Sequence, residues 1–160
     1  NKNIPVTGAD VSVENNEEDS SKTSINDETK LSITDNKEKT AEEVLIEELL
    51  EVGDRVFFDY DETKFKDEGV ETLKRQASFL IANQDLTVTI EGHCDARGTR
   101  EYNLALGERR AYSVKSFLTS LGVEASRISV ISFGKEKLQS LENNEKAWSE
   151  SRTAITTINP

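Results

Sequence analysis

The residues with the most distinctive chemistry lie in one stretch, 91–111, which reads EGHCDARGTREYNLALGERRA. It contains the only histidine of the chain, His93, the only cysteine, Cys94, and four of the eight arginines, although the chain has a formal net charge of −11. An imidazole, a thiol, the Asp95 carboxylate and several guanidinium groups close together could serve catalysis, metal binding or recognition of a charged ligand. Which of these three functions is possible depends on the helices and strands that position the side chains.

Arg110 and two of its neighbours are predicted to lie on the buried side of a helix. With 3.6 residues per turn, a helix over 100–121 gathers its apolar residues on one side, and Asn103, Gly107 and Arg110 fall on that side, while Arg109 faces outward. A buried arginine is costly unless its five N–H donors are satisfied, and a glycine inside a helix costs about 1 kcal/mol relative to alanine. We therefore predict that Gly107 keeps a small recess open beside Asn103 and Arg110.

A strand predicted at 86–91 (LTVTIE) should deliver Asp95 to the same recess, because its alternating apolar residues are typical of a strand with one buried face. Asp95 is the natural counter-charge of Arg110. One carboxylate and one guanidinium across a recess suit an amino-acid zwitterion. Its ammonium would bind Asp95, and its carboxylate would accept two parallel hydrogen bonds from the Arg110 guanidinium. The spacing leaves a second alternative open, in which Asp95 and Arg110 pair directly and close the site.

Enzyme and metal chemistry fit these residues less well. His93 and Cys94 are consecutive at the end of a strand, so their side chains should diverge, whereas a thiol nucleophile needs its base within hydrogen-bonding reach. Zinc requires three or four nitrogen or sulfur ligands, and the chain has two such residues. We therefore expect no catalytic residue, metal or cofactor, and a structural role for His93. A thiol-dependent enzyme built on Cys94 is the alternative that a Cys94→Ala variant tests.

The net negative charge of the chain argues against a nucleic-acid partner.

The apolar periodicity predicts an α+β fold. Strand patterns at 55–60, 86–91, 127–133 and 152–158 alternate with helical patterns at 67–83, 100–121 and 143–151. The order β-α-β-α-β-(α)-β predicts two main helices packed on one mixed four-stranded sheet.

The chain divides by composition into three parts. Residues 1–40 contain no aromatic residue and only scattered aliphatic residues, so we predict a disordered tether. Residues 41–53 form a short helical lead-in, and residues 54–160 form the folded domain. No apolar run approaches the ~20 residues of a membrane-spanning helix. Because the sequence has neither an initiator methionine nor a signal sequence, we expect a processed or trimmed chain.

Several spaced motifs resemble one known family. They are VFFDYDE before the first main helix, GHCDARGTREYNLALGERRAYSVKSFLTSLGV, and ISFGKEK after the second main helix. Over about residues 54–158 the chain resembles OmpA-like peptidoglycan-binding domains, and within them the peptidoglycan-associated lipoproteins. The resemblance implies non-covalent binding of meso-diaminopimelate in uncrosslinked peptidoglycan stem peptides. Asp95 matches the aspartate of the family's GH-x-D motif and Arg110 the arginine of its RA motif. The residues then expected at the ligand are Asp95, Arg110, Asn103, Phe58, Asp59, His93 and Gly107.

The resemblance also implies partners and a location. Lipid-anchored members lie on the periplasmic face of the outer membrane, held by an acylated N-terminal cysteine that this chain lacks. They bind the β-propeller protein TolB and act in the Tol-Pal system in cell division and envelope integrity. Arg97, Arg100 and Tyr102 are expected to form the rim for a TolB-like partner. The alternative is the OmpA-like domain of a porin or a flagellar stator protein with the same ligand. In a departure from the family pattern, Cys94 replaces a usual alanine or threonine. Arg152 is a weaker candidate for the groove.

Overall fold

The computed structural model describes residues 38–160, so nearly all of the predicted tether, residues 1–40, lies outside the described range. The described part begins with helix α3 (Ala41–Val52), which occupies the predicted lead-in segment. Gly53 follows it with a φ of +107°, a left-handed conformation that glycine adopts at little cost. Among residues 38–160, no helix has both the length and the apolar character needed to cross a bilayer.

Four strands form the predicted mixed sheet. They are β2 (Arg55–Phe57), β3 (Val88–His93), β4 (Ile128–Gly134) and β5 (Thr153–Ile158). Their order is β2-β5-β3-β4, with β3 and β4 parallel and the other two pairs antiparallel. The last strand of the chain thus lies between the first two, and the residues just before β5 come to lie near the end of β3.

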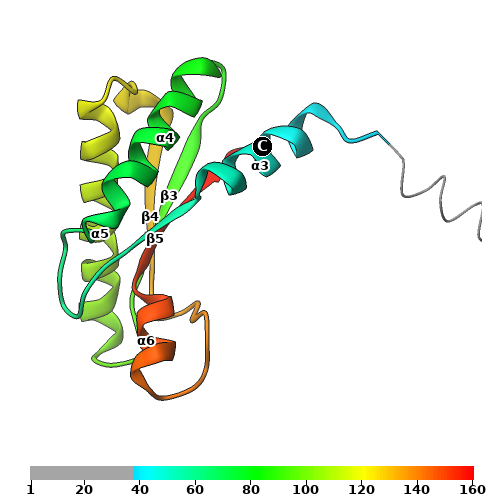
Figure 1. The fold of residues 1–160 in the computed structure, drawn as a ribbon. Helices are drawn as coiled ribbons and strands as arrows, with labels where there is room; N and C mark the ends of the chain where they lie inside the picture. The colour runs from blue at the N-terminus through cyan, green and yellow to red at the C-terminus, as the bar shows by residue number, and fades with distance from the viewer. Residues whose placement is uncertain (1–37) are drawn as a thin grey trace, which may run out of the picture. The chain divides into compact units, whose positions relative to one another are not determined.

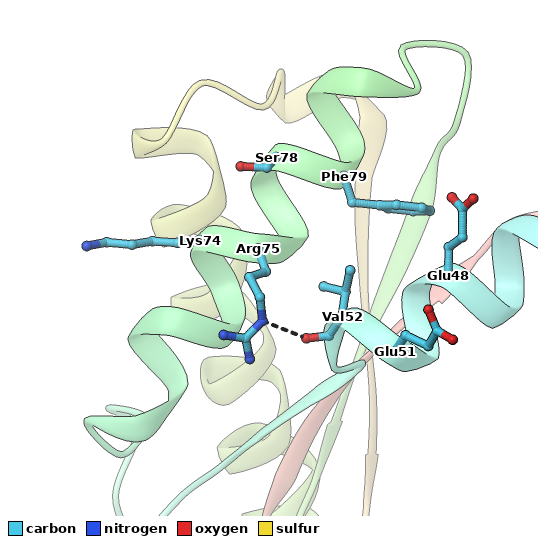
Figure 2. Close-up of a pocket in the computed structure, with 7 residues that line it drawn as sticks. All are labelled: Glu48, Glu51, Val52, Lys74, Arg75, Ser78 and Phe79. Atoms are coloured by element: carbon cyan, nitrogen blue, oxygen red, sulfur yellow. Dashed lines mark hydrogen bonds between the residues drawn. The ribbon is translucent and has the colours of Figure 1, made fainter.

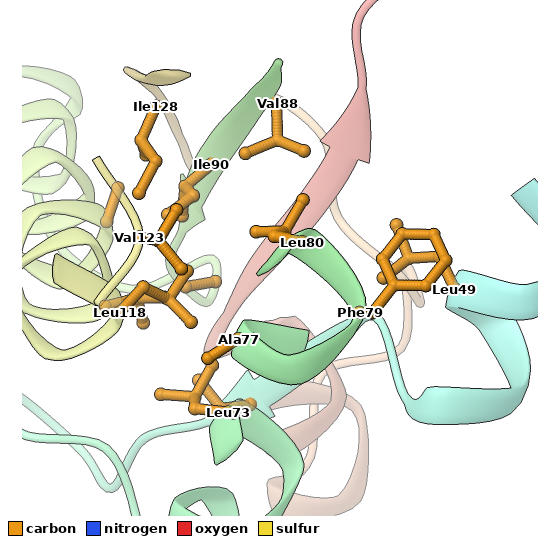
Figure 3. Close-up of a cluster of buried hydrophobic side chains, with 14 of the residues drawn as sticks. Leu49, Leu73, Ala77, Phe79, Leu80, Val88, Ile90, Leu118, Val123 and Ile128 are labelled. Carbon is orange, nitrogen blue, oxygen red and sulfur yellow. The ribbon is translucent and has the colours of Figure 1, made fainter. Parts of the chain in front are cut away.

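Two long helices, α4 (Glu68–Ala82) and α5 (Arg100–Ser120), lie over one face of this sheet (Figure 1). A short 3-10 turn, η1 (Ala125–Arg127), precedes β4, and helix α6 (Glu145–Ser151) precedes β5. The hydrophobic core fills the space between the two long helices and the sheet (Figure 3), and it includes Leu73, Leu80, Val88, Ile90, Leu118 and Val123. The predicted fold class and element order are confirmed.

The first strand is shorter than the predicted 55–60. Phe58 forms only an isolated bridge to Phe65, and Asp61 adopts a φ of +58°. The chain therefore turns away from the sheet directly after β2. The loop that results, 58–67, places several of its backbone carbonyls at the edge of the site described below.

Helix α3 is fastened to the body of the domain at its C-terminal end. Leu49 is buried with Phe79 of α4 in the core cluster (Figure 3). Arg75 Nε donates a hydrogen bond to the Val52 carbonyl at 3.1 Å (Figure 2), and Gln76 Nε2 donates to the Gly53 carbonyl at 2.7 Å. The lead-in helix is thus joined to α4 by both apolar and polar contacts.

A close approach of α5 to β3 explains two glycines. A Cβ atom added to Gly92 would lie 1.7 Å from the Gly107 carbonyl oxygen. One added to Gly107 would lie 2.3 Å from Ser132 Oγ and 2.9 Å from the Gly92 carbonyl oxygen. The prediction that Gly107 keeps a recess open is therefore wrong. Gly107 instead allows helix and strand backbones to pack against each other, which fixes the start of α5 relative to the end of β3.

Candidate ligand-binding recess

A small recess lies where β3 ends, α5 begins and the 58–67 loop passes. Its volume is about 40 Å³, and it is lined by Tyr60, Asp61, Cys94, Asp95, Arg97, Gly98, Tyr102, Asn103, Leu106 and Arg110. Five of the predicted site and rim residues are therefore brought together. The volume is far below the roughly 300 Å³ or more of typical small-molecule pockets, so the recess has room for a few water molecules at most.

Arg110 is buried, with 1% of its surface exposed, and it is held by neutral groups. Its Nε, Nη1 and Nη2 atoms donate to the backbone carbonyls of Glu62 at 2.8 Å, His93 at 3.0 Å and Asp59 at 3.0 Å. Burial lowers the pKa of its guanidinium below the ordinary value, although arginine stays protonated in proteins. The alternative in which Arg110 pairs directly with Asp95 is not realised, since Arg110 makes no ion pair with any described residue.

Asp95 is paired with two other arginines. Arg97 donates to it from its backbone N–H, Nε and Nη2 at 3.0, 3.2 and 2.9 Å. Arg152 adds a longer contact of 3.4 Å from Nη1. Burial alone would raise the pKa of the Asp95 carboxyl, but the hydrogen bonds and charge of Arg97, together with the hydrogen bond from Arg152, hold this pKa below its usual value. Asp95 therefore carries a negative charge at neutral pH.

Arg152 has a larger part in the site than the sequence indicated. It is 4% exposed and donates to the Phe58 carbonyl at 2.9 Å and to Glu145 Oε2 at 2.7 Å, besides its contact with Asp95. The partners lie 94, 7 and 57 residues away along the chain. No local sequence pattern predicts these three partners. The position of Arg152 directly before an apolar strand does indicate that its side chain is buried.

The three predicted rim residues differ in exposure. Arg100 and Tyr102 are exposed: Arg100 Nε donates to Glu136 Oε2 at 2.6 Å, and the Tyr102 hydroxyl is hydrogen-bonded to Asp61, which raises the pKa of the phenol. The Arg97 side chain, with 34% of its surface exposed, is half-buried rather than exposed. Its guanidinium carbon lies 4.2 Å from the ring centroid of Tyr60 and 3.9 Å from that of Trp148.

Phe58 and Asp59 contribute through their backbones. The Phe58 ring is buried, 5.0 Å from the Arg110 guanidinium carbon, while its carbonyl accepts from Arg152. The Asp59 carbonyl accepts from Arg110, whereas its carboxylate is exposed and lies 3.6 Å from Lys66 Nζ. These two residues therefore position the buried arginines.

Asn103 is a second positioning residue. It is buried, and its Nδ2 donates to the carbonyls of Arg97 at 2.7 Å and Thr99 at 2.9 Å. The Thr99 hydroxyl in turn accepts from the Tyr102 N–H at 3.1 Å, which caps the start of α5. Asn103 thereby ties the turn that carries Asp95 and Arg97 to the first turn of the helix that carries Arg110.

The imidazole of His93 does not line the recess. It stacks on the Phe133 ring with a centroid distance of 5.4 Å, and its Nε2 lies 3.1 Å from Glu91 Oε1. By strand alternation from buried Ile90, this is the sheet face opposite α4 and α5. Burial lowers the pKa of the imidazole, although the hydrogen bond with Glu91 opposes the shift. His93 contributes only its carbonyl to the site, as an acceptor for Arg110.

Cys94 is a buried structural thiol. Its Sγ donates to the Asn103 carbonyl at 3.3 Å, and burial raises its pKa to about 11. Because the thiolate is the nucleophilic form, such a thiol is inert at neutral pH. No group of three or more histidine, cysteine, aspartate or glutamate side chains within residues 38–160 is placed to hold a metal ion.

A larger hollow, of about 580 Å³, lies between α3 and α4 (Figure 2). It is lined by Glu48, Glu51, Val52, Lys74, Arg75, Ser78 and Phe79. The charged side chains drawn there spread around the hollow instead of converging on one point, apart from the single bond from Arg75 to Val52. The convergence of buried opposite charges thus distinguishes the small recess, despite its size.

The fold is a layer of two long helices on a mixed sheet, and it brings a buried arginine without an ion-pair partner and an aspartate to one recess. Residues 57–152 match the OmpA family, and the chain belongs to that family. It is 50% identical over 107 residues to the peptidoglycan-associated lipoprotein of Agrobacterium fabrum, covering 67% of this chain and 60% of that protein. It is 40% identical over 110 residues to the protein of the same name from Pasteurella multocida, covering 69% and 73%.

Solved structures agree in fold. The crystal structure of the peptidoglycan-associated lipoprotein from Burkholderia pseudomallei aligns with a TM-score of 0.65 and 36% identity, covering 66% of this chain and 90% of that one. The C-terminal domain of Helicobacter pylori MotB aligns with a TM-score of 0.60 at 16% identity, covering 67% and 84%, and this likeness shows the fold alone. The chain spans 60% and 64% of the length of the relatives from Agrobacterium fabrum and Mesorhizobium japonicum.

Proposed function

We propose that this chain binds the meso-diaminopimelate of uncrosslinked peptidoglycan stem peptides without covalent chemistry. The observation that carries the proposal is the buried Arg110, whose guanidinium donates to three carbonyls and forms no ion pair with a described carboxylate. A buried cation without an ion-pair partner favours an anionic ligand group. The three carbonyls occupy three of its five N–H donors, which leaves two for a ligand carboxylate.

The ligand's ammonium would bind Asp95, and its carboxylate would bind Arg110. Both side chains line the one recess and neither neutralises the other. Charge-assisted hydrogen bonds of this kind are roughly twice as strong as neutral ones. The alternative in which Asp95 and Arg110 close the site by pairing with each other loses its support, because Arg97 and Arg152 take that place at Asp95. The inert Cys94 gives no support to a thiol-dependent enzyme.

In the cell, the chain would tether the outer membrane to the peptidoglycan as the periplasmic part of a lipid-anchored protein in the Tol-Pal system. The names of the relatives from Agrobacterium fabrum and Pasteurella multocida support this assignment over a porin or flagellar stator. Sequencing the precursor upstream of Asn1 tests it. An acylated cysteine is expected there, whereas a β-barrel or a membrane-spanning helix would favour the alternatives.

A TolB-like β-propeller is the proposed protein partner. The rim of exposed Arg100, exposed Tyr102 and half-buried Arg97 surrounds the recess and offers two cations and an aromatic ring. Arginine and tyrosine are residue types enriched at protein interfaces. A partner that covers this rim would also cover the mouth of the recess.

Isothermal titration calorimetry with a muropeptide that ends in meso-diaminopimelate tests the ligand assignment. Asp95→Asn removes the charge that faces the ammonium, and Arg110→Leu removes the donors that face the carboxylate. Truncation of one member of a desolvated charge pair typically costs roughly 2–5 kcal/mol, so each variant should lose about 30- to several-thousand-fold in affinity. A muropeptide with lysine in place of diaminopimelate should also bind much more weakly, because lysine lacks the carboxylate that Arg110 would bind.

Two controls accompany this experiment. Arg109→Ala removes the adjacent arginine, which is exposed, and it should change the affinity only slightly. Arg110→Lys keeps the charge but loses the planar guanidinium that bonds three carbonyls at once, and thermal denaturation of each variant verifies folding. The assignment is wrong if folded Arg110→Leu binds like wild type, or if lysine and diaminopimelate ligands differ by no more than a few-fold.

A further inference from the structure

The Asp95 carboxylate has no acceptor position left for a ligand. A carboxylate offers about four lone-pair positions on its two oxygens. Oδ1 accepts from the backbone N–H and Nε of Arg97, and Oδ2 accepts from Arg97 Nη2 and Arg152 Nη1. A ligand ammonium can therefore bind Asp95 only if one of these donors leaves.

The donors differ in how firmly they are held. The backbone N–H belongs to the turn that Asn103 fixes through its 2.7 Å bond to the Arg97 carbonyl. The Arg152 side chain is 5% exposed and has two further acceptors, in Phe58 and Glu145. The Arg97 side chain is 34% exposed, and apart from Asp95 it is held by contact with two aromatic rings. The Arg97 guanidinium is the donor that can leave.

We propose that Arg97 is a built-in competitor for the ammonium subsite, and that ligand binding exchanges its guanidinium for the ligand's ammonium. The inference rests on the proposed function and adds a specificity-determining residue to it. The small size of the recess, about 40 Å³, supports the exchange, because an amino-acid head group of one nitrogen, two carbons and two oxygens needs the space that the Arg97 guanidinium fills. The exposed ring of Tyr60 and the ring of Trp148 both contact the Arg97 guanidinium when no ligand is bound.

The exchange makes the site selective for a free ammonium. A ligand with this group recovers the charge-assisted bonds that Asp95 loses when Arg97 leaves. A ligand whose amine is acylated, as in a crosslinked stem peptide, carries no charge to replace the guanidinium, so Arg97 remains in place. Selectivity thus arises partly from the competitor and not from the ligand contacts alone.

Removal of the competitor should strengthen binding. In Arg97→Ala, Asp95 keeps its backbone bond and Arg152 but has two vacant acceptor positions. Because half-exposed ion pairs contribute little, the expected gain in affinity for the free-amine muropeptide is about 3- to 10-fold. For the same muropeptide acetylated on its side-chain amine, Arg97→Ala should leave the affinity unchanged. Arg97→Gln, which keeps part of the aliphatic stem, should show the same pattern.

The experiment is calorimetric titration of the 160-residue chain, as wild type, Arg97→Ala, Arg97→Gln and the charge-matched control Arg109→Ala, with both muropeptides. A gain confined to the Arg97 variants and the free-amine ligand supports the exchange. Equal or weaker binding by the Arg97 variants overturns it while leaving the proposed function intact, since Arg97 would then be a ligand contact or a bystander. If neither wild type nor variant binds the free-amine muropeptide, the proposed function itself fails. In wild type, the side-chain Nε–H resonance of Arg97 should shift on saturation with the free-amine ligand, and an unmoved resonance also overturns the exchange.

Discussion

Arg110 and Arg152 are both buried, yet their charges are compensated differently. Arg152 contacts two carboxylates, Asp95 and Glu145, whereas Arg110 donates hydrogen bonds only to backbone carbonyls among the described residues. A carbonyl dipole satisfies a donor without cancelling its charge, so the charge of Arg110 is opposed only by carboxylates that form no ion pair with it, Asp95 and Asp61. Glu145 responds to its partner, since the hydrogen bond from Arg152 lowers the pKa of its carboxyl. The recess therefore has two different guanidinium groups, one without an ion-pair partner at Arg110 and one paired with Asp95 at Arg97.

His93 should make stability depend on pH, although it is remote from the recess. Its pKa is lowered in the folded state, above all by burial. The unfolded chain then binds a proton at pH values where the folded domain does not, so the free energy of unfolding falls as pH drops through about 6.5. The slope cannot exceed about 1.4 kcal/mol per pH unit for one group. Chemical denaturation between pH 5 and 8 measures it.

Because His93 is the only histidine, its own variant isolates the effect. His93→Gln, which can hydrogen-bond but does not titrate, should flatten the stability profile between pH 6 and 7.5. Below about pH 5, both proteins should lose stability again, since the lowered pKa of Asp95 adds stability that disappears as that carboxyl is protonated. A slope between pH 6 and 7.5 that is the same in wild type and His93→Gln would contradict the assignment.

At the scale of elements, the contact between α5 and β3 determines where the site residues lie. Gly107→Ala should destabilise the domain by about 1–3 kcal/mol, as overpacking typically does. Helix propensity alone predicts the opposite sign, a gain of about 1 kcal/mol. The added Cβ would lie 2.9 Å from the Gly92 carbonyl oxygen, a backbone atom that cannot rotate away. Urea denaturation of the variant determines the sign.

Ser132 provides the internal control for that experiment. Its Oγ lies 2.3 Å from the position of the added Cβ. Gly107→Ala combined with Ser132→Ala should therefore recover part of the lost stability, as expected for neighbours that couple. A stabilised Gly107→Ala variant would show that α5 can move away from β3 without cost.

The sequence predicted elements well and side-chain partners poorly. Helical periodicity placed Arg110 inward and Arg109 outward because that phase depends only on local geometry, and α5 confirms it. Asp95, in contrast, had four nearby arginines as possible partners in the sequence, and the choice depends on distances that only the tertiary fold sets. Arg152 joined the site because β5 inserts between β2 and β3. The end of the first strand was also missed, since the turn at Asp61 has no glycine or proline to mark it.

At the scale of the whole molecule, one end of the sheet carries the recess and its rim. Asp95 follows β3, Arg152 precedes β5, and Arg100 begins α5, so three elements meet there. The rim contains two arginines, Arg97 and Arg100, although the whole chain has a formal net charge of −11. Both rim arginines are paired with carboxylates, Arg97 with Asp95 and Arg100 with Glu136. A partner must therefore compete with these ion pairs to bind the two arginines.

The proposed ligand and the proposed partner should exclude each other, because the rim residues Arg97 and Tyr102 also line the recess. Titration of a TolB-like β-propeller at rising muropeptide concentrations should raise its apparent Kd in proportion, and by linkage the partner should weaken muropeptide binding by the same factor. Arg100→Ala separates the two surfaces: Arg100 lies on the rim, pairs with Glu136 and does not line the recess. It should weaken partner binding several-fold and leave muropeptide binding unchanged, while Asp95→Asn should do the reverse. Formation of a ternary complex with both affinities unchanged would show that the two sites are separate.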